Sequence, residues 1–330
     1  MNSTAKTSTD PRAAQGRRAL LAFAIRAGLG VAFLGLFLWL YGAKKIVSIL
    51  AHERLDLFTA AVALYVAGQV MSSYRWLLLA RINQIGGPWR EYLRYYFIGI
   101  ATNLFVPGLI GGDAARAAYL GLRRQRMPQA IASVIADRGV GLVALFWMAA
   151  IAIPLVSTVT LPRNLTAVTM LVGIGLVIGF VAAPWLIAPA RRLSGRIARI
   201  VDPLLPYLEK PLALIPAIIL SLLLQASLSV CQYILALGMG LSVPLSAVLL
   251  IVPMANVAAS LPLTLNGLGL REGAYILLFA LAGVSHEDAV ALGLLWFACT
   301  MVGGLTGLIP FVMTPVPQPD PALSEIAALS

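Results

Sequence analysis

The sequence predicts an all-α polytopic membrane protein with six full spans and two broken, re-entrant segments, arranged as two inverted repeats. Of its 330 residues, 60% are hydrophobic and only 11% are charged, whereas soluble domains carry about 25% charged residues. Apolar runs of about 20 residues, long enough to span a bilayer, recur along the chain. Two further apolar segments, Asn103–Tyr119 and Ala258–Tyr275, are interrupted by proline and glycine.

The elements follow from the alternation of apolar runs and basic loops. The full spans are expected at residues 19–41, 57–80, 130–154, 165–188, 212–237 and 289–312. The polar residues 1–18 are expected to form a disordered cytoplasmic tail, and the proline-rich residues 313–330 a flexible one. Residues 19–312 are therefore predicted to form a single transmembrane domain.

The two broken segments share the pattern Pro-x4-Gly-x3-Arg, and their spacing indicates an internal duplication. The prolines, glycines and arginines are offset by the same amount (262−107, 267−112 and 271−116 all give 155), which also carries the second and third spans onto the fifth and sixth. The predicted halves are residues 19–156 and 165–312. Paired broken segments at matching places in two halves point to a binding site in transporters.

The distribution of lysine and arginine predicts the orientation, because cytoplasmic loops carry the excess of positive charge. The N-terminus and the loops on both sides of the first broken segment are basic, so this segment is expected to dip into the membrane from the cytoplasm and return. Because each half would have three spans, an odd number, the second half would begin on the opposite side of the membrane. Its broken segment would therefore enter from the opposite face. The alternative is that the broken segments cross the membrane, which gives eight or even ten spans.

The charge and the cysteines exclude several classes of protein. The net charge is +11, but the positive residues lie in short loops between apolar runs, so membrane topology explains them better than nucleic acid does. Cys231 and Cys299 lie inside apolar runs, and His52 and His286 are isolated. We therefore expect no metal site and no cofactor. The sequence also lacks a P-loop and a nucleophile elbow, so no catalytic residues are predicted.

The arginines of the broken segments are the strongest candidates for substrate binding. An arginine near the bilayer centre costs about 2.5–3.5 kcal/mol on insertion scales, which suggests a partner or a function. A guanidinium group binds phosphate bidentately. Alternatively, Arg116 and Arg271 form structural ion pairs with Asp113 and Glu272, or extend to the membrane surface. The predicted substrate-binding residues are Arg116, Arg271, Asp113, Glu272, Asn103, Asp137 and Arg138.

Other polar and aromatic residues allow more than one interpretation. Asp137 and Arg138 are read as residues at the start of the third span or as part of a polar cluster with the first broken segment, and Arg75 as an interfacial arginine. Asn103 would bond freed backbone carbonyls or line a cavity. The predicted hinges are Pro107, Gly111, Gly112, Pro262, Gly267 and Gly269. An interfacial aromatic belt is predicted at Tyr74, Trp76, Trp89, Tyr92, Tyr95 and Tyr96.

Four motifs give the chain a family resemblance. They are Arg75-Trp76, the Gly-Gly-Asp-x2-Arg that ends at Arg116, Asp137-Arg138, and the Gly-x-Gly-x-Arg-Glu that ends at Glu272. With them the chain resembles the lysylphosphatidylglycerol synthase transmembrane-region family, also called flippase-like. The resemblance implies a multi-pass protein of the bacterial inner membrane, with a cytoplasmic N-terminus, that moves or presents lipids.

The resemblance leads to one expected function and two alternatives. We expect a lipid translocase that acts on an anionic or phosphate-bearing lipid, with membrane lipids as its partners. The best-known relatives carry an aminoacyltransferase domain, which this sequence lacks, so we do not expect an enzyme in its own right. The alternatives are a membrane subunit of a lipid-modifying system, which would work with a separate transferase, and a small-molecule transporter.

Overall fold

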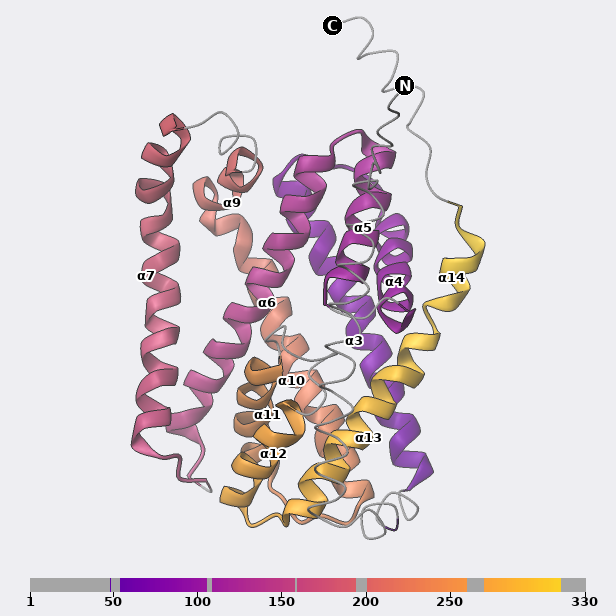
Figure 1. Cartoon of the computed structure of the whole chain (residues 1–330), viewed down its shortest axis with the longest axis vertical. Coiled ribbons are helices and arrows are strands. Elements are labelled where there is room, and N and C mark those ends of the chain that lie inside the picture. The colour runs from indigo at the N-terminus through magenta and orange to yellow at the C-terminus, as the bar shows by residue number, and fades with distance from the viewer. Residues whose placement is uncertain are drawn as a thin grey trace, which may run out of the picture.

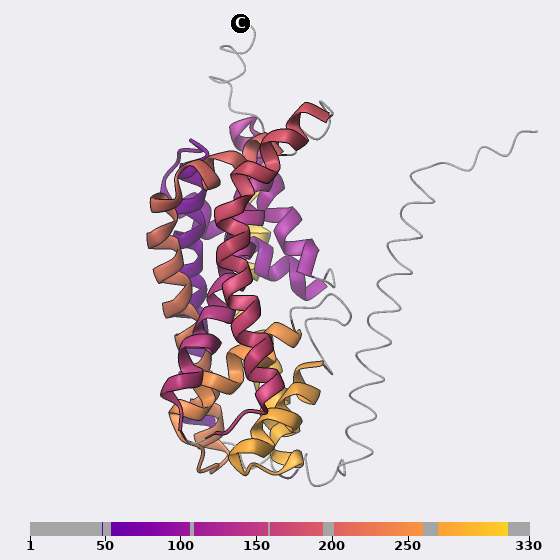
Figure 2. The same ribbon diagram turned by 90° about the vertical axis from the view of Figure 1, so that its left-hand side faces the viewer.

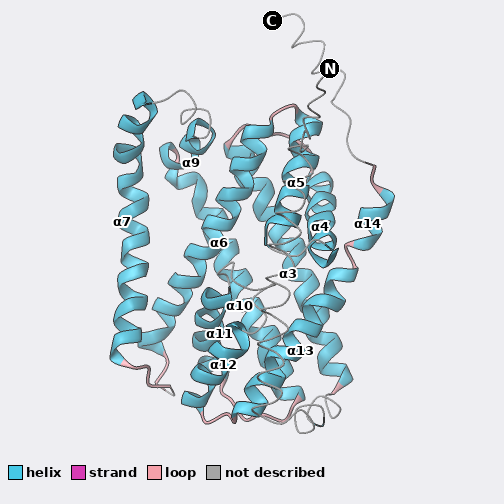
Figure 3. Cartoon of the chain, viewed as in Figure 1, coloured by secondary structure: helices cyan, strands magenta, loops and turns pink. Residues whose placement is uncertain are grey.

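A computed structural model describes residues 48, 54–105, 109–157, 159–193, 201–259 and 270–315. Within this part of the chain every regular element is a helix and none is a strand (Figure 3). The all-α prediction is therefore confirmed for these residues. Several predictions fall outside the described residues: the first span at 19–41, the tails at 1–18 and 316–330, and the hinges Pro107, Pro262, Gly267 and Gly269.

Four long helical segments are apolar enough to cross a membrane. They are α3 (Leu55–Ile82), α6 (Met127–Leu155), α10 (Ile215–Gly238) with the turn before it, and α13 (His286–Leu305) continued by α14 (Leu308–Met313). They correspond to the predicted second, third, fifth and sixth spans. Each segment has 28 or 29 residues, a length of about 42 Å, which exceeds the hydrocarbon core of about 30 Å. The chain is thus a multi-pass membrane protein.

The ends of these helices follow from local sequence. Pro128 lies in the first turn of α6 and Pro216 in that of α10, where the missing N–H of proline would have had no helical partner. The Ser285 hydroxyl accepts a hydrogen bond from the Asp288 N–H and caps α13. The remaining long helix is α7 (Arg163–Leu193). Short helical elements are η1 (Asp202–Leu204), α9 (Leu205–Glu209), η2 (Pro211–Leu214) and η4 (Ala280–Ala282).

The two broken segments form two pairs of shorter helices. The first pair is α4 (Trp89–Phe105) and α5 (Leu109–Arg124), and the second is α11 (Leu245–Ala259) and α12 (Leu270–Phe279). The members of each pair pack against one another, and each pair is called a hairpin below. The α4–α5 pair lies in the upper half of the molecule and the α11–α12 pair in the lower half, in both perpendicular views (Figures 1 and 2). None of the four reaches the 20 residues of a plain membrane span.

The aromatic residues at the upper end form a core cluster instead of a continuous belt. Trp76 and Tyr92 are fully buried, with ring centroids 5.1 Å apart, and Tyr95 is nearly so. The predicted interfacial position is therefore wrong for these three residues. Tyr74 and Trp89 are exposed and contact each other edge to face. The error arises because hydropathy locates a residue along a span but does not say which neighbour covers it.

Candidate functional site

The helices α4 and α5 cross at two glycines whose backbones touch. A Cβ atom on Gly99 would lie 2.7 Å from the carbonyl oxygen of Gly112, so neither position has room for a side chain. The Gly112 N–H donates to the Asn103 Oδ1 atom over 2.7 Å. Gly112 is in the first turn of α5, whose N–H groups have no partner inside the helix. Asn103 thus accepts a hydrogen bond from a backbone N–H, and among the described residues it forms none with a freed carbonyl, which was the first of its two interpretations.

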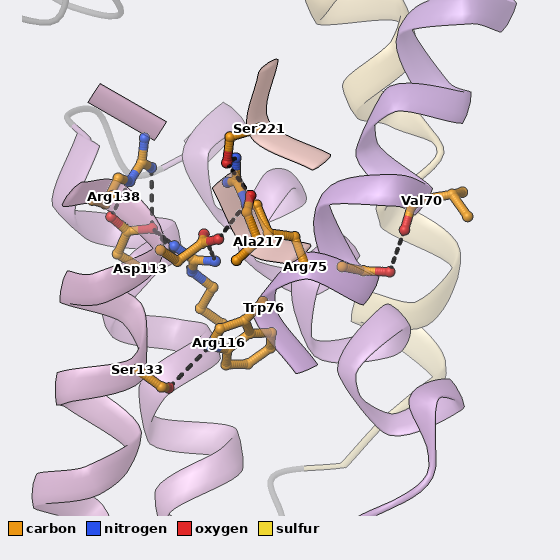
Figure 4. A network of polar contacts seen from close by, with 11 residues as sticks. Val70, Arg75, Trp76, Asp113, Arg116, Ser133, Arg138, Ala217 and Ser221 are labelled. Atoms are coloured by element: carbon orange, nitrogen blue, oxygen red, sulfur yellow. Dashed lines mark hydrogen bonds and ion pairs between the residues drawn. The ribbon is translucent and has the colours of Figure 1, made fainter. Parts of the chain in front are cut away.

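A buried carboxylate of α6, Asp137, contacts two arginines from other helices, Arg75 and Arg116, which are labelled in Figure 4. Asp137 accepts a hydrogen bond from Arg75 Nε at 2.8 Å and another from Arg116 Nη1 at 2.7 Å. Arg75 Nη1 also donates to the Ser221 hydroxyl of α10 at 2.9 Å. All four side chains are buried. The contacts therefore connect α3, α5, α6 and α10 around a single negative charge.

Two predictions about this region are wrong. Arg75 lies about two turns before the end of α3 and is only 5% exposed, so it does not extend to the membrane surface. Asp137 is the eleventh residue of α6 and not part of its first turn, because the helix begins at Met127. The polar-cluster interpretation of Asp137 agrees with the structure, since its partner Arg116 belongs to the first broken segment.

A second carboxylate extends the network toward solvent. Asp113 accepts from Arg116 Nε at 3.1 Å, and it is held by both Nε and Nη2 of Arg138, at 2.6 and 3.0 Å. This two-pronged contact is the strong geometry for an arginine and a carboxylate. The Arg138 side chain remains 49% exposed. With Arg75 and Asp137 included, the cluster holds three positive and two negative groups, a net charge of +1.

Arg116 is held by two carboxylates and two aromatic rings. Its three side-chain nitrogens all contact Asp113 or Asp137. Its guanidinium carbon also lies 5.2 Å from the Trp76 ring centroid and 5.1 Å from that of Tyr96, within range of a cation–π interaction. The alternative prediction of an ion pair with Asp113 is confirmed. These contacts offset the cost of burying the charge of Arg116.

Residues from both broken segments line one cavity of about 340 Å³. Asn103, Asp113 and Arg116 belong to the first segment, and Asn256 and Arg271 to the second. Arg138 of α6 completes the charged part of the wall. Five of the seven predicted binding residues thus line the same space: Asn103, Asp113, Arg116, Arg138 and Arg271.

The other two predicted binding residues lie outside the cavity wall. Asp137 is buried beside Arg116. Glu272 is fully buried and packs against α13, where a Cβ atom on Gly293 would lie 2.9 Å from the Glu272 Cγ atom. No set of three metal-ligating side chains occurs in the described part of the chain.

Several cavity residues were not predicted. Tyr65 and Gln69 of α3 and Gln225 of α10 also line the cavity. A polar side chain within an apolar span is itself a functional signal. Both glutamines lie within predicted spans, so this signal could have identified them from the sequence. Arg75 and Ser221 were missed as well, although Arg75 belongs to one of the family motifs.

The fold and this site define a class, a helical multi-pass membrane protein with a charged internal cavity lined by two pairs of short helices. The family model described as the lysylphosphatidylglycerol synthase TM region matches residues 22–307, and the chain belongs to this family. The predicted resemblance is thereby confirmed. No curated protein matches the chain.

Proposed function

We propose that the protein is a lipid translocase of the bacterial inner membrane, with a cytoplasmic N-terminus, and that it carries an anionic or phosphate-bearing lipid. Its family is one of membrane proteins in lipid modification or translocation, which supports the coarser part of this statement. Translocation itself, the direction of the N-terminus and the inner membrane are our inference from the charge distribution and the cavity.

The observation that carries the proposal is the charge of the cavity wall. Among the described residues that line it, three are arginines and one is an aspartate, a net charge of +2. An anionic headgroup compensates this charge, whereas a cationic one would add to it. Arg138 is the best candidate for direct contact with a phosphate because half of its side chain is exposed. Arg116, whose nitrogens are already occupied, would hold the network in place.

The arrangement of the two hairpins suggests how a headgroup would pass. Arg138 contacts the α4–α5 hairpin through Asp113, and Arg271 belongs to the α11–α12 hairpin. If the hairpins belong to inverted repeats, they enter from opposite faces, and each arginine would serve the headgroup in one of two states. The cavity is at the small end of the range of about 300–1,000 Å³ for ligand sites. It would take a headgroup while the acyl chains remain in the bilayer.

A flux assay in proteoliposomes tests the proposal. A fluorescent anionic phospholipid in the outer leaflet should become inaccessible to a quencher faster with protein than without it. The double variant Arg138→Ala with Arg271→Ala should slow this exchange at least about tenfold, because both phosphate contacts are lost. Arg163→Ala, at the exposed start of α7, is the matched control and should leave the rate unchanged. Wild-type flux equal to that of empty liposomes would refute the proposal.

The description of the family favours a second candidate, a membrane subunit of a lipid-modifying system. In this case the cavity would present a lipid to a separate transferase. Copurification of such a transferase, together with a change in lipid composition that requires it, would support this candidate. Lipid flux by the purified protein alone supports translocation instead.

A further inference from the structure

The guanidinium group of Arg138 already holds an anion, the carboxylate of Asp113. Its Nε and Nη2 atoms donate to the two Asp113 oxygens at 2.6 and 3.0 Å, and a phosphate group binds to an arginine through the same pair of parallel N–H groups. Both side chains line the cavity, and the Arg138 side chain is 49% exposed. An anion that enters the cavity therefore finds this edge of Arg138 covered by a carboxylate of the protein itself.

Asp113 can leave Arg138 without becoming an uncompensated charge. Its Oδ1 atom also accepts from Arg116 Nε at 3.1 Å and lies 2.9 Å from Arg116 Nη2. Arg116 follows Asp113 by three residues on the same helix, so these contacts do not depend on the position of α6. The Asp113 side chain is 19% exposed and lines the cavity, so water can reach its Oδ2 atom when Arg138 is withdrawn. Breaking a buried ion pair is costly mainly when one charge is left alone, and here Arg116 remains.

The second hairpin has no counterpart of this pair. The offset of 155 places Leu268 at the position of Asp113 (113 + 155) and Gly293 at that of Arg138 (138 + 155). The net charge of +1 in the network of the first hairpin has room for one more negative charge, which a bound monoanion supplies. An exchange of anions on an arginine is therefore possible at the first hairpin in a way that the second does not share.

We propose that Asp113 is the resident anion of the substrate site, and that a phosphate-type oxyanion displaces it from Arg138. The oxyanion takes over the Nε and Nη2 donors, and Asp113 stays with Arg116. Because Asp113 belongs to α5 and Arg138 to α6, the exchange also releases this ionic link between the first hairpin and α6. The return of the carboxylate then expels the oxyanion. This inference rests on the proposed function, because it assigns the exchange step at that site; a phosphate group of a lipid and free phosphate share the chemistry that it requires.

A calorimetric titration of the purified full-length protein with inorganic phosphate tests the exchange. Asp113→Asn removes the competitor, so the half-saturating phosphate concentration should fall at least about fivefold, a gain that a misfolded protein cannot show. Asp113→Ser should give the same gain and replaces Asp113→Asn if that variant does not fold. Both substitutions also make the cavity more positive. In an Arg138→Ala background the gain should disappear, whereas a gain from net charge alone would persist and would overturn the exchange.

Glu91→Gln is the matched control for the loss of a carboxylate. Glu91 pairs with Arg124 outside the described cavity wall, and its side chain is 24% exposed, close to the 19% of Asp113. This variant should bind phosphate as the wild type does. Phosphate affinity that is unchanged or lower in Asp113→Asn would overturn the exchange.

The flux assay distinguishes a lipid headgroup from free phosphate as the displacing anion. In proteoliposomes Asp113→Asn should reach half-maximal flux at a lower mole fraction of the fluorescent anionic lipid. Its maximal flux should be lower too, because no carboxylate returns to expel the headgroup, whereas a merely structural defect would lower the maximum alone. Tighter phosphate binding with wild-type flux parameters would assign the site to free phosphate and overturn the exchange in lipid transport. Wild-type flux equal to that of empty liposomes would instead overturn the translocase, an outcome that the phosphate titration does not decide.

Discussion

Arg75 and Asp137 are 62 residues apart in the sequence, yet their side chains are joined inside the protein by a hydrogen bond of 2.8 Å. Because Asp137 also binds Arg116, one carboxylate compensates two buried guanidinium groups. Arg75 in turn reaches Ser221 of α10. Asp137 therefore links the first hairpin to the long helices, in addition to the ion pair between Asp113 of α5 and Arg138 of α6.

Removal of that charge should destabilise the fold. In Asp137→Asn two buried arginines lose their shared counter-ion, and breaking a buried ion pair costs about 3–5 kcal/mol. Thermal unfolding in detergent, followed by size-exclusion chromatography, should show a clearly lower midpoint. Arg54→Ala breaks an exposed ion pair with Asp56 and serves as the control, with a midpoint equal to wild type. A stable Asp137→Asn protein would show that the network does not support the fold.

Two arginines of the network should separate stability from transport. Arg116→Ala should lower the thermal midpoint strongly, because it leaves Asp137 and Asp113 with less compensation in a buried position. Arg138→Ala should keep the midpoint near that of wild type and still reduce lipid flux, because its side chain is half exposed. The thermal midpoint and the lipid flux should be measured on the same preparations of both variants. A low midpoint for Arg138→Ala together with a wild-type midpoint for Arg116→Ala would contradict the roles that we assign to these residues.

The contact between α4 and α5 predicts a steric effect. Gly112→Ala places a methyl group against the Gly99 backbone and the Asn103 side chain, so α5 must shift. Overpacking of this kind costs about 1–3 kcal/mol, and the shift should also reduce flux. Gly175→Ala is the control, since nothing lies within 4 Å of its Cβ position in α7. There the higher helix propensity of alanine should leave stability unchanged or slightly higher. Equal behaviour of both variants would contradict the tight crossing.

The proposed orientation of the hairpins can be tested by cysteine labelling. Gly86 precedes α4 at the upper end of the molecule and Ser242 precedes α11 at the lower end (Figure 1), and both are exposed. A membrane-impermeant maleimide applied to whole spheroplasts should modify Ser242→Cys, and it should modify Gly86→Cys only after lysis. The native Cys231 and Cys299 are fully buried and should give little background. Labelling of both variants from one side would exclude hairpins that enter from opposite faces.

Much of the architecture was predictable because it is encoded locally. Hydropathy alone located the four long segments that the structure describes as able to cross a membrane. The proline and glycine interruptions likewise located the two pairs of short helices. The same local signals singled out Arg116 and Arg271, both of which line the cavity. A charge inside an apolar segment requires compensation wherever it lies.

The errors and omissions concern contacts between distant segments. Whether Arg75 reaches the membrane surface or Asp137 depends on how α3 packs against α6, which no pattern within α3 reveals. The burial of Trp76 likewise depends on α4, and the contact between Arg75 and Ser221 spans 146 residues. For Asn103 the backbone was correctly predicted as a partner, but the predicted group was a carbonyl and the observed group is an N–H.

The pairing of α3 with α10 constrains any movement of the protein. Within the described residues these two helices share the most extensive interface, although α3 comes from the N-terminal half of the chain and α10 from the C-terminal half. The α3–α10 pair therefore joins the two halves of the chain. The halves cannot separate as two rigid blocks without breaking this interface. We expect α3 and α10 to keep their positions while the short helices move against them, so that a small displacement changes which side of the bilayer reaches the polar cavity.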